Sequence, residues 1–143
     1  MIVLTPYIIA IIVAWLLAHV IKYAIAISKG RVLDLTHQLF ISGGMPSSHA
    51  ATSVSVWMVI LLKDGMQSGL FGLATLVVLI VTYDAVKVRR SSGEQGEAIT
   101  QLIHETKSNI RIPRSAKGHT PLEVFAGSIL GACIGLVVFL ATK

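Results

Sequence analysis

Four apolar stretches, each close to the length of a membrane-spanning helix, dominate the sequence. They cover residues 6–27, 46–62, 69–86 and 121–142. Hydrophobic residues make up 54% of the 143 residues and charged residues only 13%, which is too apolar for an ordinary water-soluble domain. Because a bilayer core of about 30 Å needs about 20 helical residues, we predict an all-α integral membrane bundle of about four transmembrane helices, formed by one domain over residues 1–143.

The second stretch is the shortest of the four. We expect it to be tilted, or to begin below the membrane surface in a cavity lined by protein.

Basic residues gather on one side of the predicted bundle. If the helices alternate in direction, residues 28–45 and 88–118 lie on one side, and residues 63–68 lie on the other with both termini. That first side holds ten of the twelve basic residues: Lys22, Lys29, Arg31, Lys87, Arg89, Arg90, Lys107, Arg111, Arg114 and Lys117. The positive-inside rule makes this side cytoplasmic, and we expect a multi-pass protein of the plasma membrane. A phosphate-binding site on the same side would produce the same bias.

The long polar segment between the third and fourth stretches has helical features of its own. Ser92 and Gln95 fit a capping box, and the apolar residues between Ala98 and Ile103 repeat at helical spacing. We predict an amphipathic helix over about 93–108, lying on the membrane surface or over the site, followed by an irregular connector over 109–118. A partly ordered loop is the alternative.

A stripe of small residues marks the last apolar stretch. Gly127, Gly131 and Gly135 repeat at a spacing of four, so they lie on one face of the predicted helix. Such a face lets a neighbouring membrane helix approach closely. The neighbour is either another helix of this chain or a helix of a second copy, which would make the protein a homo-oligomer.

Ionisable residues cluster near the basic side, where an apolar bundle should not carry them without a reason. Such groups usually face the interior of a bundle or a wet cavity and indicate a functional site. The alternative is that the basic ones extend to the lipid headgroups, which we favour for Lys29 and Arg31 taken alone. The cluster consists of His19, Lys22, His49, Asp84, Lys87, Arg89, Arg90, His119 and Glu123.

Three segments resemble a known family in their residues and in their order along the chain. GGMPSSHAA, then YDAVKVRR followed by SGEQ, then GHTPLEVFAG, are similar to the divergent branch of the type-2 phosphatidic acid phosphatase superfamily, which is related to vanadium-dependent haloperoxidases. The likeness covers nearly the whole chain. In the wider superfamily the site has a basic first motif, a Pro-Ser-Gly-His motif, and an arginine that precedes a histidine followed four residues later by an aspartate.

The resemblance implies site residues by position. Residues 46–49 take the place of the second motif with serine for glycine, and His119 and Glu123 take the end of the third with glutamate for aspartate. Arg89 or Arg90 stands where the arginine is expected, although residues 91–118 intervene. The usual first motif is missing, and Lys22, Lys29 and Arg31 are loose substitutes for it.

The chemistry of these residues agrees with the implied roles. Arginines and the start of a helix neutralise phosphate oxygens, so we predict that Ser47, Ser48, Arg89, Arg90, Lys22 and Arg31 bind the phosphate. His119 would attack phosphorus to form a phosphohistidine, and His49 would protonate the leaving oxygen. Glu123 would hold His119 in its reactive tautomer. Asp84 and Lys87 would support the site, and no metal ion or cofactor is required.

Two of these assignments have alternatives. Thr120 and Glu123 also fit a capping box, so Glu123 is either a partner of His119 or only a cap of its helix. His19, His37 and His104 would join His49 and His119 in a metal site, but the sequence contains no metal-ligand spacing such as His-x-x-x-His.

Together these features predict a membrane phosphatase that hydrolyses a lipid phosphate or diphosphate, with phosphatidate-like and prenyl phosphates as candidates. The alternative is a noncatalytic protein that binds or transports a lipid phosphate in the same basic pocket. A structural protein without a ligand would leave the ionisable cluster unexplained. We expect no nucleic-acid partner despite the net charge of +5, because the charge lies at a membrane face.

Overall fold

The protein folds as a bundle of helices. A computed structural model describes residues 4–30, 44–112 and 118–143. The bundle contains α1 (Pro6–Ser28), α3 (Ser48–Asp64), α4 (Gly69–Tyr83) and α6 (Pro121–Ala141), and a π-helical turn, η1 (Asp84–Val88), joins α4 to α5 (Arg89–Glu105). The described residues form no strand. The predicted all-α membrane bundle is therefore confirmed.

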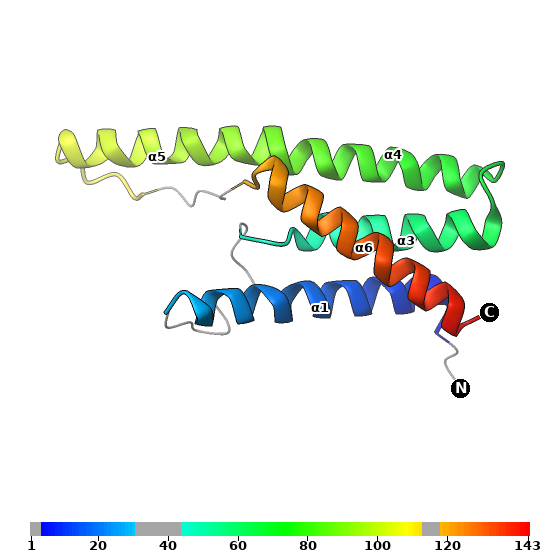
Figure 1. The fold of residues 1–143 in the computed structure, drawn as a ribbon. Coiled ribbons are helices and arrows are strands. Elements are labelled where there is room, and N and C mark those ends of the chain that lie inside the picture. The colour runs from blue at the N-terminus through cyan, green and yellow to red at the C-terminus, as the bar shows by residue number, and fades with distance from the viewer. Residues whose placement is uncertain (1–3, 31–43, 113–117) are drawn as a thin grey trace.

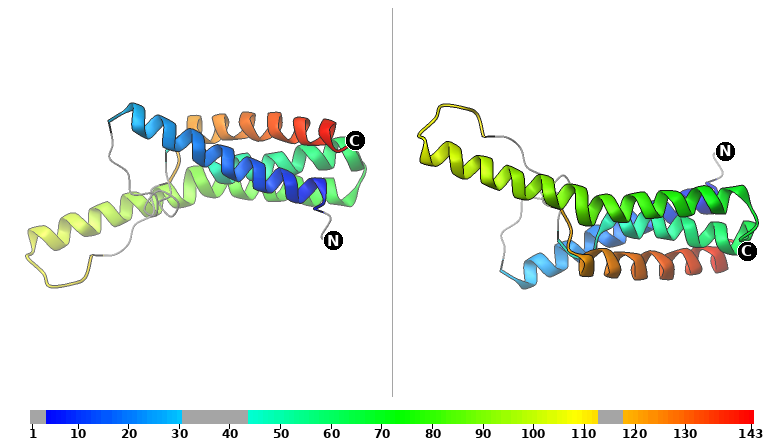
Figure 2. Two further views of the ribbon diagram at one scale, coloured as in Figure 1. Left: turned by 90° about the horizontal axis from the view of Figure 1, so that it is seen from below. Right: turned by 90° about the horizontal axis from the view of Figure 1, so that it is seen from above.

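Successive helices of the bundle run in opposite directions. Both termini and the loop between α3 and α4 lie at one end, and the starts of α3 and α6 lie at the other (Figure 1). The two views in Figure 2 show the same arrangement from below and above. Tyr7 ties the terminal end together, since its hydroxyl donates a 2.7 Å hydrogen bond to Asp64 Oδ2. The predicted alternation is correct, and it brings the polar helix ends to one side.

Helix α3 is the central helix of the bundle. It packs against α1, α4 and α6, and α1 also packs against α6. Within the described ranges, three helices are long and apolar enough to cross a membrane: α1, the continuous helix from Gly69 to Glu105, and α6. Helix α3 has only 17 residues. Because its neighbours cover it, α3 can carry polar residues that a lipid-facing helix cannot.

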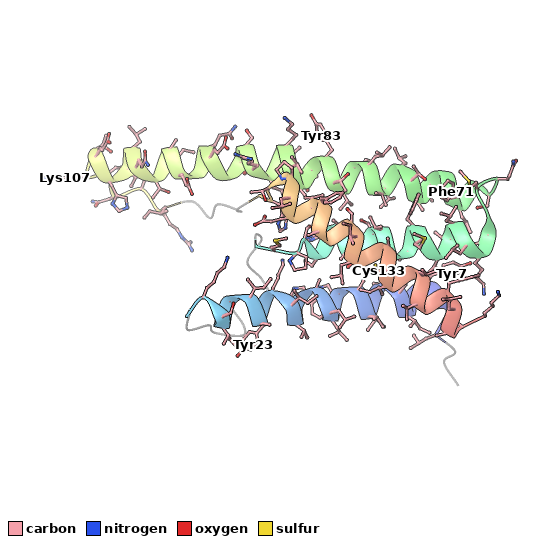
Figure 3. The ribbon with its side chains drawn as sticks, viewed as in Figure 1. Tyr7, Tyr23, Phe71, Tyr83, Lys107 and Cys133 are labelled. Carbon is pink, nitrogen blue, oxygen red and sulfur yellow. The ribbon has the colours of Figure 1, made fainter. Side chains whose placement is uncertain are left out.

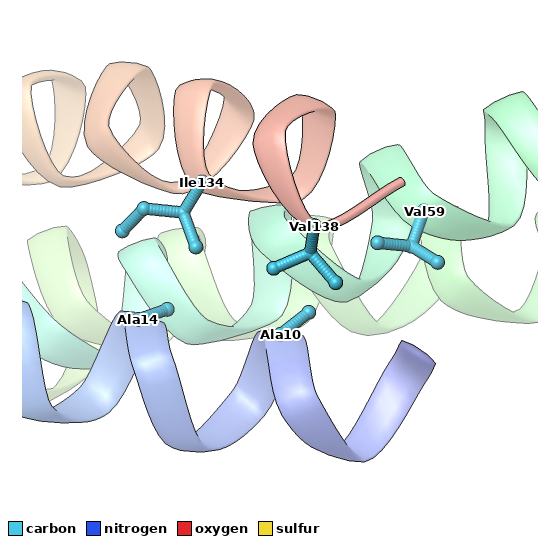
Figure 4. Close-up of a cluster of buried hydrophobic side chains, with 5 residues drawn as sticks. All are labelled: Ala10, Ala14, Val59, Ile134 and Val138. Carbon is cyan, nitrogen blue, oxygen red and sulfur yellow. The ribbon is translucent and has the colours of Figure 1, made fainter. Parts of the chain in front are cut away.

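Small side chains let α1 approach the centre of the bundle. Ala10, Ala14 and Ala18 repeat every fourth residue on α1 and are fully buried. Ala10 and Ala14 pack with Val59 of α3 and with Ile134 and Val138 of α6 (Figure 4). Close packing of this kind stabilises helix association in a membrane. The hydrophobic effect does not drive that association there, because lipid tails are as apolar as the side chains.

The glycine stripe of α6 packs against α3 of the same chain. A Cβ atom added to Gly127 would overlap the carbonyl oxygen of Ser47, and one added to Gly131 would overlap the carbonyl oxygen of Ala51. At Gly135 the added atom would lie 2.5 Å from the carbonyl oxygen of Ser55. The stripe is therefore used within the chain. Of the two neighbours that the sequence left open, the structure shows the one within the chain, α3, and a homo-oligomer stays a prediction.

The polar segment after α4 is helical, but it is not a separate helix. Helix α4 continues through η1 into α5 without a break, giving 37 helical residues from Gly69 to Glu105. This helix is about 55 Å long, well beyond a bilayer core. In Figure 3, Phe71 lies toward one end of it and Lys107 lies just past the other.

One prediction about this segment was wrong, and one of the two placements predicted for its helix is excluded. Ser92 and Gln95 do not cap a helix start, since both lie inside α5. Helix α5 extends away from the bundle and does not fold over the site (Figure 1). The predicted irregular connector is confirmed where it is described, because residues 108–112 and 118–120 have no regular secondary structure.

Helix α3 begins later than the sequence suggested. Its first residue is Ser48, and Ser47 is the N-cap, whose hydroxyl accepts a hydrogen bond from the backbone N–H of Ala50. Pro46 precedes the helix and is not its first residue. Gly44 has a φ of +81°, which glycine adopts without strain and which turns the chain just before the motif.

Candidate active site

The polar residues of α1, α3 and η1–α5 meet around one cavity. It has a volume of about 760 Å³ and lies between α1, α3 and α4, with His119 at its edge. At one end it is lined by ionisable and hydroxyl side chains, namely His19, Lys22, Ser48, His49, Thr52, Ser53, Arg89 and His119. Toward the other end its walls are apolar and include Ile11, Ile60, Leu70 and Val77. The cavity thus joins a basic pocket to an apolar groove.

His119 is held against the π-helical turn. Its backbone N–H donates a 3.0 Å hydrogen bond to the carbonyl oxygen of Ala85, and its side chain is only 2% exposed. Ala85 packs with Ala50 of α3 and Val124 of α6 in a second buried cluster. The histidine is therefore fixed by three elements that are far apart in the sequence.

Glu123 serves both His119 and the start of α6. Its Oε2 atom lies 3.1 Å from His119 Nδ1 and accepts a 3.0 Å hydrogen bond from the backbone N–H of Thr120. In return, the Thr120 hydroxyl accepts a 3.3 Å hydrogen bond from the backbone N–H of Glu123. The capping box and the His119 contact are both present, so the two alternatives from the sequence do not exclude each other.

This arrangement selects one tautomer of His119. An ionised carboxylate can only accept a hydrogen bond, so Nδ1 carries the proton and donates a hydrogen bond to Glu123. In the neutral ring Nε2 then has a free lone pair. An imidazole oriented in this way is suited to act as a nucleophile through Nε2.

Burial also keeps the His119 ring neutral. Removal from solvent lowers the pKa of His119 below its ordinary value, and this effect outweighs the hydrogen bond to Glu123, which raises the pKa. His119 lies before Pro121, the first residue of α6, and so outside the spanning segment. The neutral form therefore persists to lower pH than in a free histidine.

Arg89 points into the cavity because of the π-helical turn. In an α-helix, residues five apart lie about 140° apart around the axis, but a π turn brings them to nearly the same side. Here the backbone N–H of Arg89 bonds to the carbonyl oxygen of Asp84, and Arg89 Nε forms an ion pair with Asp84 Oδ2. Asp84, which was expected to support the site, therefore holds the Arg89 side chain in an ion pair.

Three predicted site residues lie elsewhere. Arg90 is exposed and pairs with Glu94 at 3.2 Å, since it lies on a different face of the helix from Arg89. Lys87 is exposed and does not line the cavity. Ser47 is fully buried against α6, where its backbone N–H donates to the carbonyl oxygen of Glu123 at 3.0 Å. Its hydroxyl caps α3, so Ser47 positions the helix and is not placed to bind phosphate.

The other predicted residues are placed as expected where they are described. Lys22, Ser48 and His49 line the basic end of the cavity with Arg89 and His119. Arg31, His37, Arg114 and Lys117 lie outside the described residues. Among the residues described, no three His, Cys, Asp or Glu side chains are grouped closely enough to hold a metal ion.

Sequence reasoning missed three polar residues of the cavity. His19 was counted in the ionisable cluster but given no role toward the phosphate, and Thr52 and Ser53 were given no role in the site. The signal was available in the helical spacing. His19 lies three residues before Lys22, and Thr52 and Ser53 lie three and four residues after His49, so each shares a face with a predicted site residue.

Comparisons with known proteins identify the family of the chain. The family model described as the Divergent PAP2 family matches residues 4–134. The chain is also 32% identical over 140 residues to YuiD, an uncharacterized membrane protein of Bacillus subtilis strain 168, covering 87% of this chain and 88% of the relative. No solved structure matches. Because the family match spans α1 through most of α6 and includes every residue that lines the cavity, the chain is a membrane protein that belongs to the Divergent PAP2 family.

Proposed function

We propose that the protein hydrolyses a lipid phosphate or diphosphate at the basic end of the cavity. The observation that carries this proposal is the single cavity, basic at one end and apolar along the rest. A molecule with a phosphate head and a hydrocarbon tail matches both parts. Family membership supports the same chemistry, since motif residues through which the chain resembles the phosphatase superfamily line the basic end of the cavity, namely Ser48, His49, Arg89 and His119.

The basic end can neutralise a phosphate group. Lys22 and Arg89 supply positive charge, and Ser48 lies in the first turn of α3, where backbone N–H groups have no partner within the helix. Asp84 orients the Arg89 guanidinium through Nε, which leaves its two terminal nitrogens for phosphate oxygens.

The two histidines divide the reaction between them. Nε2 of His119 attacks phosphorus, the bond from phosphorus to the leaving oxygen breaks, and protonated His49 gives its proton to that oxygen. Neutral His49 then takes a proton from water, which attacks the phosphohistidine and releases inorganic phosphate. His119 returns to its neutral state, held by Glu123 throughout.

The groove is long enough for the tail within one leaflet. Each wall of the cavity covers twelve residues of helix, from Lys22 to Ile11, from His49 to Ile60 and from Val81 to Leu70, so eleven steps of rise give about 16 Å. This is about half of a bilayer core of about 30 Å. A lipid whose headgroup enters the basic end would therefore keep its tail at the depth it has in the membrane.

The orientation follows from the charge distribution. Lys22, Lys29, Arg89 and Lys107 lie toward the end of the bundle that holds the site, and Lys63 and Lys143 lie at the other end. We propose a plasma-membrane location, and the positive-inside rule supports an orientation with the site on the cytoplasmic side. A protease-cleavable tag after Lys143 tests this orientation. Protease added outside intact cells should cut the tag, and a protected tag would mean that the orientation is the opposite one.

Phosphate release is the direct test of the proposed activity. The purified protein in detergent, given a panel of phosphatidate, lysophosphatidate and prenyl phosphates, should release phosphate from at least one, and vanadate should inhibit it. His119→Ala and His49→Ala should lose this activity, while His104→Ala, which alters an exposed histidine of α5, should keep it. Saturable binding without turnover of any lipid would favour the noncatalytic binding or transport protein.

A further inference from the structure

Within the polar end of the cavity, one layer of side chains lies between the charged residues and the apolar groove. On α1, His19 lies between Lys22 and Trp15, and on α3, Thr52 and Ser53 lie between His49 and Val56. All of these residues line the cavity. The layer formed by His19, Thr52 and Ser53, called the acceptor layer below, therefore faces the part of a lipid that connects its phosphate to its tail.

His19 offers a hydrogen-bond acceptor to the cavity. Its Nδ1 lies 2.8 Å from the carbonyl oxygen of Trp15, and its ring stacks against the Trp15 ring with centroids 4.3 Å apart. A carbonyl oxygen can only accept, so Nδ1 is the donor. In the neutral ring Nε2 is then left with a lone pair, held in place by the stacking.

The two hydroxyls of the layer are also acceptors. Thr52 Oγ1 donates its hydrogen to the carbonyl oxygen of Ser48 at 2.8 Å, and Ser53 Oγ donates to that of His49 at 2.9 Å. Each hydroxyl has one hydrogen and two lone pairs. With the hydrogens committed to the backbone, only lone pairs remain for a ligand.

A layer of acceptors needs a donor from its ligand. We propose that His19, Thr52 and Ser53 form a subsite for a free hydroxyl group next to the phosphate, so that the site selects glycerol-based lipid phosphates with an unesterified hydroxyl over prenyl phosphates. An ester carbonyl in the same place is itself an acceptor and could form no hydrogen bond with the layer. A prenyl chain has no polar group there and would leave the layer without a hydrogen-bond donor. This inference rests on the proposed function only for the position of the phosphate.

The test compares the binding of two matched lipids. Lysophosphatidate carries the hydroxyl, and its deoxy analogue with the same acyl chain lacks it; a prenyl phosphate is the third probe. Binding to the purified protein in detergent is measured by calorimetry, and phosphate release is measured in parallel. Wild type should bind lysophosphatidate more tightly than either other lipid, by about 2- to 10-fold, because its hydroxyl has one hydrogen to donate to the layer.

Two variants remove acceptors, and a third serves as control. His19→Phe keeps an aromatic ring against Trp15 but removes Nε2, and Thr52→Val removes the oxygen at nearly constant size. Thr82→Val is the matched control, because Thr82 on α4 makes the same bond to the carbonyl four residues back, at 2.8 Å, but does not line the cavity. The preference for lysophosphatidate should fall in the first two variants and persist in the control.

The possible results separate this inference from the proposed activity. Equal binding of the three lipids by wild type, or binding of none, would overturn the subsite, as would a preference unchanged in both His19→Phe and Thr52→Val. If His19→Phe does not fold, Thr52→Val decides the question. A clear preference without phosphate release would keep the subsite and reject hydrolysis.

Discussion

Glu123 Oε2 lies 3.1 Å from Nδ1 of the buried His119, and the same oxygen caps α6 by accepting a hydrogen bond from the backbone N–H of Thr120. One carboxylate oxygen thus ties the histidine to the start of α6. Because the helix start fixes the carboxylate, the imidazole is held at Nδ1 by a partner that cannot rotate freely. This coupling between a helix cap and a candidate nucleophile is the basis of the first prediction.

Replacing Glu123 with glutamine should change both the rate and the pH dependence of phosphate release. The amide can present its NH₂ group to Nδ1, which would favour the unreactive tautomer, so kcat should fall by about 10²- to 10⁴-fold. The carboxylate raises the pKa of His119, so its loss lowers that pKa further. Since His119 attacks as the neutral ring, the acid limb of kcat/KM attributable to it should move to lower pH. A limb that stays in place or moves upward would contradict the assigned contact.

Arg89 and Arg90 should differ sharply when each is replaced by alanine. Only Arg89 lines the cavity, so Arg89→Ala should weaken lipid phosphate binding by about 10- to 100-fold, as expected for hydrogen bonds to a charged group. Arg90→Ala removes an exposed pair with Glu94 and should leave binding within about 3-fold of wild type. Calorimetry on the two variants measures this difference. Equal losses, or a larger loss for Arg90→Ala, would show that the π turn does not select Arg89.

The contact between α3 and α6 can be tested by adding a single methyl group. Gly131→Ala would push a Cβ atom into the backbone of Ala51, so the helices must separate, and unfolding in detergent should become easier by about 1–3 kcal/mol. Gly72→Ala on α4 is the control, since its Cβ would meet nothing within 4 Å. That change should be neutral or stabilising, because alanine favours a helix. A Gly131→Ala protein as stable as wild type would mean that the two helices pack elsewhere.

Gly118 should matter for activity more than for the fold. A Cβ atom at this position would overlap the backbone of Arg90, just ahead of the segment that docks His119 on Ala85. Gly118→Ala should therefore displace His119 and reduce turnover by about 10-fold or more, in keeping with the cost of misplacing a reacting group. The melting temperature should change less than in Gly131→Ala. A variant with full activity would show that the close contact between Gly118 and the backbone of Arg90 is not needed to position His119.

The sequence predicted the bundle well because its signals are local. The length and polarity of the apolar stretches define α1 and α6, and the motifs around His49 and His119 place those residues at the polar end of the bundle. The pairing of His119 with Glu123 was implied by the family resemblance, and it forms although His119 precedes α6, because Glu123 reaches back as a capping residue. These features require no knowledge of how the helices pack.

The errors came from features that depend on packing. The polar residues from Asp84 onward suggested that α4 ends there, but no proline or capping residue stops the helix, so it continues as a π turn and then as α5. Which of Arg89 and Arg90 faces the cavity depends on the π turn, which contains more residues than an α-helical turn. Likewise, the glycine spacing in α6 predicts a close neighbour but does not say which one, and only the packing of α3 identifies it.

Trapping a phosphorylated enzyme is the most direct test of the central claim that His119 attacks the phosphate. Wild-type protein mixed with a ³²P-labelled lipid phosphate and quenched in alkali should carry a label that is stable to base and lost in acid, and peptide mapping should place it on His119. His49→Ala should slow the loss of this label, and His104→Ala should behave as wild type. A label on another residue, or phosphate release by His119→Ala at the wild-type rate, would contradict the account.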